Sequence, residues 1–234
     1  QDATGGDGGN MSPLFSVVTP TRNRPGWLPR CIASVQAQTC PEYEHLIYDV
    51  GDEPVERLLP DDPRIRYVRG RCQGMVGDIN AAYELARGEI LTTVSDDDRL
   101  APAALETVAR TIGDADWLVA MTAILDQHDN TLCYRGGTRE SLEQTMAIDY
   151  MLGGAIYVRP RLFARVGTYD QAYEGAGDVD LYRRFARASM PVLIEDVLYL
   201  YTDHPGTDSR VRAQHQRQQV ARIYADTPIA PAVR

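Results

Sequence analysis

The chain has 234 residues, of which 44% are hydrophobic and 24% are charged, and its formal net charge is −9 at pH 7. This composition is typical of a globular protein with one large domain. The acidic balance excludes a protein that binds the nucleic-acid backbone, because such binding needs a basic surface. The four cysteines lack the spacing of a zinc site, and no apolar run approaches the roughly 18–20 residues that cross a bilayer. We therefore expect a cytoplasmic protein without an integral membrane segment.

The first half of the chain predicts strands and helices in alternation. Residues 1–13, which begin with a run rich in glycine and aspartate, are expected to form a flexible tail. Strands are expected where apolar and β-branched residues gather, at 15–19, 44–50, 64–68 and 89–94. Helices are expected between them, at 27–39, 55–59 and 75–86. This alternation predicts an α/β fold with a mostly parallel central sheet flanked by helices.

The second half of the chain is less regular. Strands are expected at 117–125, 154–158, 191–194 and 197–201. Helices are expected at 161–165, 178–188 and 214–224. No linker divides the sequence, so a single domain is predicted from residue 14 to residue 234.

Three consecutive carboxylates, Asp96, Asp97 and Asp98, follow the strand predicted at 89–94. Adjacent like charges repel, so a fold keeps them together where a cation offsets the cost. Carboxylate oxygens suit Mg²⁺ or Mn²⁺, although the run could also be a solvated acidic turn that caps the next helix. Asp49 is expected at the same edge of the sheet, where ligands of parallel sheets bind. This convergence predicts a nucleotide site.

Six segments of the chain occur in the order found in a known family, at 16–24, 34–39, 79–90, 153–170, 177–184 and 201–204. They include the opening Ser-Val-Val-Thr-Pro-Thr-Arg-Asn-Arg and the later Gly-Asp-Val-Asp-Leu. Together they resemble glycosyltransferases of the GT-A fold, most closely the inverting family 2, over residues 15–209. The resemblance implies the nucleotide-diphospho-sugar transferase fold. In that fold residues 14–100 would be the nucleotide-binding half, 101–210 the acceptor half, and 211–234 a C-terminal helix and tail.

The resemblance also implies a metal site for Mn²⁺ or Mg²⁺ within the acidic run. The metal-binding position of the family matches Asp97 or Asp98, and counting back from Pro102 favours Asp97 as the direct ligand. Asp96 would then face the ribose or the sugar of the donor. His204 matches a late histidine that completes the metal shell or reaches the diphosphate in some relatives.

The general base implied by the resemblance is Asp178, at the start of a helix whose N-terminus favours the ionised carboxylate. Relatives have glutamate before this aspartate, whereas this chain has Gly177. Glu174 and Asp180 are therefore kept as alternative bases. Asp180 is also expected to pair with Arg184, four residues later on the same helix.

The remaining site residues concern the donor and the acceptor. Asp49 is expected to pair with a uracil or thymine ring, with Asp52 as the substitute. Other positions are expected to contact the nucleotide, the diphosphate or the sugars: Pro20, Thr21 and Arg22 around the ring and ribose, Arg24 and Arg71 at the diphosphate, and Gly153 and Gly154 on the acceptor side.

The function expected from this sequence is transfer of a single sugar from a UDP- or dTDP-linked donor to a hydroxyl of a glycan or small-molecule acceptor. The reaction would be metal-dependent and inverting, with Asp178 as general base. A catalytically silent nucleotide-sugar binding module is the alternative, because Gly177 and Val50 replace acidic residues of the family pattern. A sugar nucleotidyltransferase is less favoured, since the loop after the first strand lacks its glycine pattern. No binding to nucleic acid is expected, and the sequence indicates no particular oligomeric state.

Overall fold

The computed structural model of the protein describes residues 12–147 and 154–227. Its N-terminal part is a parallel sheet in the order β3-β2-β1-β4. These strands are β1 (Phe15–Thr21), β2 (Tyr43–Asp49), β3 (Ile65–Arg69) and β4 (Ile90–Thr93). The helices between them are α1 (Leu28–Gln36), the 3-10 turn η1 (Glu56–Leu58) and α2 (Met75–Leu85). The tail predicted at 1–13 lies outside the described residues except for its last two.

Strand β1 continues past the proline that was expected to end it. The carbonyl of Val18 accepts from Val94 on the β4 side, and the carbonyl of Thr21 accepts from Val50 on the β2 side. Pro20, two residues after Val18, therefore turns its missing N–H toward β4, where pairing has already stopped at Val18. The proline costs no ladder bond, and the strand can deliver the following residues to the sheet edge.

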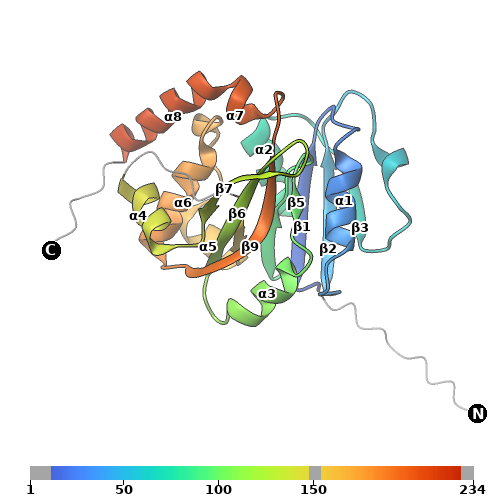
Figure 1. Ribbon diagram of the computed structural model, residues 1–234, viewed down its shortest axis with the longest axis horizontal. Coiled ribbons are helices and arrows are strands. Elements are labelled where there is room, and N and C mark those ends of the chain that lie inside the picture. The colour runs from blue at the N-terminus through green and yellow to red at the C-terminus, as the bar shows by residue number, and fades with distance from the viewer. Residues whose placement is uncertain (1–11, 148–153, 228–234) are drawn as a thin grey trace, which may run out of the picture.

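The C-terminal part extends the same sheet with mixed directions (Figure 1). Its strands are β5 (Arg99–Leu100), β6 (Trp117–Asp126), β7 (Thr131–Gly136), β8 (Ile156–Val158) and β9 (Val192–Asp203). Strand β8 joins the halves because it pairs antiparallel with both β4 and β6. Strand β9 runs parallel to β6 and antiparallel to β5. The α/β class is confirmed, with the parallel ladders concentrated in the first half.

Strand β9 is one continuous strand, where two had been predicted. Its register with β6 shifts between Val119 and Met121, which face Leu193 and Val197. The stretch of β9 between these residues is irregular and contains exposed acidic residues. In the sequence, these acidic residues separate the two strands that had been predicted.

Helices cover the sheet and close one end of it. They are α3 (Ala104–Thr111), α4 (Arg139–Ala147), α5 (Pro160–Val166), the 3-10 turn η2 (Gln171–Tyr173), α6 (Gly177–Ala188), α7 (Asp208–Val211) and α8 (Ala213–Asp226). Helix α8 lies along the top of Figure 1, beside α6. Its Val220 and Ile223 pack with Tyr173, Ala176 and Val179 in a separate apolar cluster. Strand β7 and helix α4 had not been predicted.

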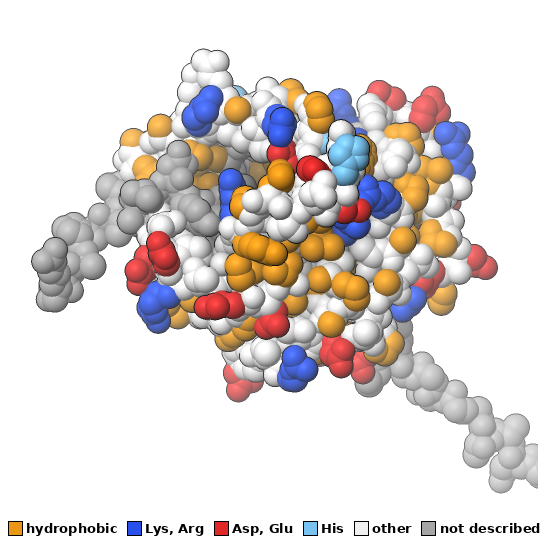
Figure 2. Space-filling model, in the orientation of Figure 1, with side chains coloured by type: hydrophobic (Ala, Val, Ile, Leu, Met, Phe, Trp, Pro, Cys, Tyr) orange, Lys and Arg blue, Asp and Glu red, His pale blue; other side chains and the backbone are white. Residues whose placement is uncertain are grey.

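The view in Figure 2 shows acidic and basic side chains interspersed around hydrophobic ones that gather over β9. Among residues 12–147 and 154–227, no helix is long and apolar enough to span a membrane.

A histidine is buried between the two central parallel strands. His45 of β2 is 0% exposed, and its Nε2 lies 2.9 Å from the hydroxyl of Thr19 on β1. Its other ring nitrogen has no hydrogen-bond partner among the described residues. Burial lowers the pKa of His45 from 6.5 to about 3. The imidazole is therefore neutral in the folded protein at physiological pH.

We expect His45 to make folding pH-sensitive. Its pKa is lowered in the folded state. The full contribution of neutral His45 to the free energy of unfolding is therefore present above pH 6.5 and is lost as the pH falls toward 3. Between pH 6.5 and pH 5 the loss should approach about 2 kcal/mol, because one unit of pKa corresponds to about 1.4 kcal/mol. Urea unfolding at pH 7 and pH 5 should show a smaller loss of stability for His45→Gln than for the wild type. The exposed His128→Gln is the matched control, and an equal loss in all three proteins would contradict the assignment.

Candidate active site

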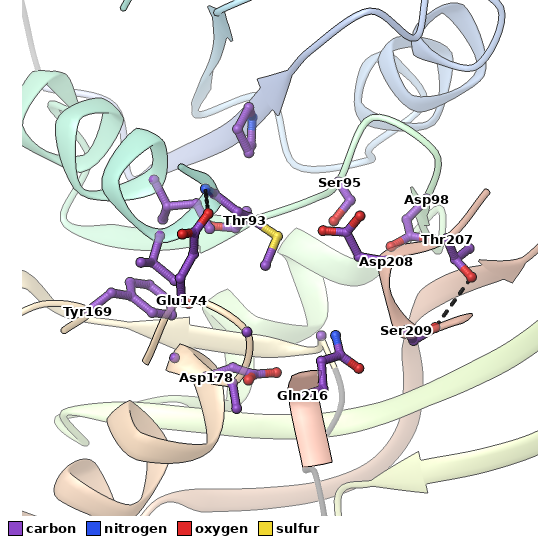
Figure 3. Close-up of a pocket in the computed structure, with 18 of the residues that line it drawn as sticks. Thr93, Ser95, Asp98, Tyr169, Glu174, Asp178, Thr207, Asp208, Ser209 and Gln216 are labelled. Carbon is purple, nitrogen blue, oxygen red and sulfur yellow. Dashed lines mark hydrogen bonds between the residues drawn. The ribbon is translucent and has the colours of Figure 1, made fainter. Parts of the chain in front are cut away.

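A cleft of about 770 Å³ opens at the carboxyl ends of β1 and β4 and extends to α6 and α8. Most of the residues predicted for the site line this one cavity: Pro20, Thr21, Arg22, Arg24, Asp96, Asp97, Asp98, Gly154 and Asp178. Figure 3 shows Asp178 directed into the cavity, near Gln216 of α8, with Asp98 and Asp208 on another wall. Residues separated by more than 150 positions in the sequence thus meet at one site.

Arg24 binds the first two aspartates of the acidic run. Its Nη1 lies 3.2 Å from Oδ1 of Asp96 and 2.5 Å from Oδ2 of Asp97. The hydroxyl of Thr21 donates to Oδ2 of Asp96 at 2.8 Å. Burial raises the pKa of Asp96 to about 6, and the neighbouring charge of Asp97 adds to this shift, while Arg24 opposes it. The loop after β1 therefore supplies the cation that the sequence required for this run.

Asp98 points into the fold. The hydroxyl of Tyr199 donates to its Oδ2 and the backbone N–H of Thr202 donates to its Oδ1, both at 2.7 Å. Burial, together with the charge of Asp97, raises the pKa of this carboxyl well above its ordinary value. Both oxygens accept hydrogen bonds from β9, and a role of Asp98 as a metal ligand stays a prediction.

His204 follows β9 and reaches the same carboxylate as Arg24. Its Nε2 lies 3.2 Å from Oδ2 of Asp97, and the N–H of Gly206 donates to its Nδ1 at 3.1 Å. Since Nδ1 accepts, the proton is on Nε2, which donates to Asp97. The ring also stacks on Trp27, with centroids 4.5 Å apart. In this arrangement His204 orients Asp97, and its role toward a metal or the diphosphate stays a prediction.

The acidic turn fits a divalent cation that has few protein ligands. Asp96 and Asp97 place two carboxylates against the single charge of Arg24, and Oδ1 of Asp97 accepts no hydrogen bond from the described residues. Among residues 12–147 and 154–227, no group of three or more aspartate, glutamate, histidine or cysteine side chains is arranged to hold a metal ion. This geometry suits a cation that is bound by one or two carboxylates and whose coordination shell is completed by substrate phosphates. Mg²⁺ is commonly bound in this way.

Asp178 is the second residue of α6 and is half-buried in the cleft. Burial raises the pKa of its carboxyl, although the N–H of Val179 opposes the shift with a hydrogen bond to Oδ1. Gly177 before it packs against Val76, and a Cβ at this position would lie 2.7 Å from Cγ1 of that valine. The absence of the expected glutamate therefore has a local packing cause.

The two alternative bases have different environments. Asp180 is buried and its Oδ2 accepts from the guanidinium of Arg184 at 2.7 Å, so the predicted pairing is confirmed. Glu174 lines the cleft and its Oε1 accepts from the backbone N–H of Met75 at 3.3 Å. Asp180 is thus a structural residue, whereas Glu174 remains within the cavity.

Asp49 is fully buried at the end of β2 and does not line the cleft. Its carboxylate accepts from the N–H groups of Gly51 and Val55, the hydroxyl of Tyr67 and the guanidinium of Arg69. Burial alone would raise the pKa of Asp49, but these donors lower it overall. In this structure Asp49 holds the loop that follows β2, and its pairing with a nucleobase stays a prediction.

The remaining predicted site residues are Asp52, Arg71, Gly153 and Gly154. Asp52, the substitute for Asp49, is exposed and is held by hydrogen bonds with Asn23. Arg71 is exposed and lies outside the cleft lining, and its contact with a diphosphate stays a prediction. Gly154 lines the cleft against the ring of Tyr199, where a Cβ would come within 2.8 Å. Gly153 lies outside the described residues.

The C-terminal wall of the cleft was not anticipated from the sequence. It is formed by residues of α7, α8 and their surroundings, namely Thr207, Asp208, Ser209, Arg210, Arg212, Ala213, Gln216, Arg217 and Val220. The spacing of Ala213, Gln216, Arg217 and Val220 along α8 places them on one helix face. This spacing was visible in the sequence, but nothing in it indicated which surface the helix covers.

Known proteins share this sequence pattern. The sequence model of a family described as glycosyl transferase family 2 matches residues 16–169. A PGL/p-HBAD biosynthesis glycosyltransferase of Mycobacterium bovis is 30% identical over 186 residues, which cover 72% of this chain and 68% of that protein.

Solved structures share the fold. S. aureus TarS 1–349, in complex with UDP-GlcNAc, superposes with a TM-score of 0.70 at 15% identity, covering 93% of this chain and 68% of that one. The mannosyltransferase PcManGT of Pyrobaculum calidifontis, in complex with GDP-Man and Mn²⁺, gives a TM-score of 0.70 at 18% identity, covering 95% and 67%. The chain spans 41% of a longer TarS structure.

Asp98 is hydrogen-bonded to β9, whereas Asp97 is hydrogen-bonded to Arg24, and measurements of stability can test this difference. Asp98→Ala should lower the free energy of unfolding by about 2–5 kcal/mol, because it leaves two buried donors on β9 without an acceptor. Asp97→Ala should change it by less than about 1 kcal/mol, since Arg24 keeps Asp96 and a repulsion is removed. Urea unfolding of both variants and of Tyr199→Phe measures these values. A loss from Asp97→Ala as large as that from Asp98→Ala would refute the distinction.

Proposed function

Because the chain belongs to glycosyl transferase family 2 and is a glycosyltransferase enzyme, we propose that it moves a single sugar from a UDP- or dTDP-linked donor to an acceptor hydroxyl. The acceptor is a glycan or a small molecule, and the reaction is metal-dependent and inverts the anomeric carbon. The observation that carries this proposal is that the acidic turn and Asp178 line the same cleft. The acidic turn would be the leaving-group site, and Asp178 would be the base for the acceptor in the same cavity.

The donor half of the proposal rests on the loop after β1 and the acidic turn. Pro20, Thr21 and Arg22 line the cleft where the nucleoside would lie. Asp97 would hold Mn²⁺ or Mg²⁺, and Asp96, beside Thr21, would face the ribose or the sugar. The metal, when bound, would offset the charge that develops on the leaving diphosphate. The ligands named in the TarS and PcManGT structures, UDP-GlcNAc and GDP-Man with Mn²⁺, support a nucleotide-sugar donor.

The acceptor half rests on Asp178. The acceptor oxygen attacks the anomeric carbon while its proton passes to the Asp178 carboxylate, and the bond from that carbon to the diphosphate oxygen breaks. The nucleoside diphosphate leaves with the bonding electron pair. A carboxylate in a half-buried position with a raised pKa is suited to hold this proton. Tyr169 and Tyr182, whose pKa values burial raises well above the ordinary range, stay neutral beside it.

The silent binding module remains the alternative. Gly177 supported it at the sequence level, but its packing against Val76 gives that glycine a structural reason unrelated to the loss of a base. Turnover separates the two functions, because a silent module would bind nucleotide and release none. A cytoplasmic location stays a prediction.

Nucleotide binding should depend on the metal and on Asp97. Calorimetric titration with UDP, dTDP and GDP, each with and without Mn²⁺, should show metal-dependent binding of a pyrimidine nucleotide. Asp97→Ala should weaken it by at least about tenfold, equivalent to roughly 1.4 kcal/mol. Arg110→Ala, at an exposed position of α3 outside the cleft lining, is the control. Absence of binding by every nucleotide would disprove the donor site, and a preference for GDP would disprove the UDP or dTDP assignment.

Asp178→Asn should slow release of nucleoside diphosphate from a donor panel of UDP-glucose, UDP-GlcNAc, dTDP-glucose and GDP-mannose by about 10²–10⁴-fold. Nucleotide affinity should change little. In the wild type the rate should fall as the pH decreases through the raised pKa of Asp178, because the base is then protonated. Glu174→Gln is the matched variant in the same cleft. If it abolishes turnover while Asp178→Asn does not, the base is Glu174.

A further inference from the structure

Arg24 already occupies the carboxylates to which the proposed function assigns the metal. We propose that Arg24 is a resident counter-cation of the acidic turn. It competes with a divalent metal in the free protein and moves to the diphosphate when a nucleotide binds, so metal and nucleotide bind cooperatively. This inference rests on the proposed function and deepens it, because it concerns the order in which the same site fills.

The first observation is the shared guanidinium nitrogen. Nη1 of Arg24 donates to Oδ1 of Asp96 at 3.2 Å and to Oδ2 of Asp97 at 2.5 Å. Asp96 is 4% exposed and Asp97 is 9% exposed. Like-charged carboxylates in such a position need a compensating cation, and in the free protein Arg24 supplies it. The turn is therefore stabilised before any metal arrives.

The second observation is that the metal ligand and the Arg24 partner are the same group. Oδ2 of Asp97 accepts from both Arg24 and Nε2 of His204. A dication on Asp97 would lie close to the guanidinium and to this N–H, and cations at such separations repel strongly in a partly buried site. Binding of a metal to the free protein must therefore displace Arg24 or share its carboxylate at a cost.

The third observation is that Arg24 has acceptors on its other side. Its Nη2 lies 3.3 Å from the carbonyl of Gly206 and 4.0 Å from Oδ1 of Asp208. The side chain is 29% exposed and lines the cleft. Guanidinium groups bind phosphate oxygens in pairs. A diphosphate in the cleft therefore offers Arg24 new partners as the metal takes the carboxylates.

The two binding events are then linked. A nucleotide that draws Arg24 away improves the metal site, and by thermodynamic reciprocity the metal improves nucleotide affinity by the same factor. A static Arg24 that contacts only the diphosphate has a different consequence. Its loss would weaken nucleotide binding without any gain in the affinity for metal alone.

The experiment is titration of Mn²⁺ into the full chain, followed by the electron paramagnetic resonance signal of free Mn²⁺, alone and with saturating UDP. Arg24→Gln should bind Mn²⁺ alone at least about tenfold more tightly than the wild type, and the gain that UDP gives should shrink by a similar factor. Arg24→Lys keeps a charge and should fall between them. Arg110→Gln, which removes an exposed arginine of α3 outside the cleft lining, should bind Mn²⁺ alone as the wild type does.

Two outcomes overturn the inference in distinguishable ways. If the wild type binds UDP with Mn²⁺ but neither Arg24 variant binds Mn²⁺ alone more tightly, the role of Arg24 is overturned and the proposed function stands. If the wild type binds neither UDP, dTDP nor GDP with Mn²⁺, both fail. Circular dichroism confirms the fold of each variant, and the Lys variant preserves the test if the Gln variant unfolds.

Discussion

The hydrogen bonds that Asp98 accepts from Tyr199 and Thr202 determine how the acidic turn is used. They join the end of β4 to β9 across more than 100 residues of sequence. Because both oxygens of this buried carboxylate accept hydrogen bonds, its position in the fold is fixed. Its neighbours Asp96 and Asp97 are left to face Arg24 and the cleft. A run of three identical residues is thus divided into one carboxylate held by β9 and two held by Arg24.

The same strand carries the next part of the site. Beyond Thr202, β9 ends at Asp203, and His204 follows with its ring on Asp97 and against Trp27 at the start of α1. Arg24, three residues before Trp27, reaches the same carboxylate. One contact from the beginning of the chain, made by Arg24, and one from its later part, made by His204, therefore hold Asp97 in place. A stacked ring loses little freedom on binding, so Trp27 and His204 can hold this geometry at a low entropic cost.

The sequence predicted the alternating first half well because its signals were local. The strands around Val17, Leu46 and Leu91 are apolar runs, and the helices between them have regular spacing. Through the resemblance to the family it also assigned Asp97 and Asp178 to one site, and both line the cleft. The donors to Asp49 were not predicted: Gly51 and Val55 lie in the loop after β2, whereas Tyr67 and Arg69 lie on β3. No local pattern indicates whether a carboxylate turns toward its own loop or toward a ligand.

The wall formed by α8 could not be predicted for a related reason. Its apolar residues Val220 and Ile223 pack on a small cluster with Tyr173, and the partner of a short amphipathic face depends on tertiary contacts. This wall changes the electrostatics of the cleft. Arg212 and Arg217 add positive charge to a cavity whose other residues include Asp96, Asp97 and Asp178. In the proposed function an anionic donor would be repelled by the carboxylates alone. The arginines around them, Arg24 first, would offset this repulsion before a metal completes the site.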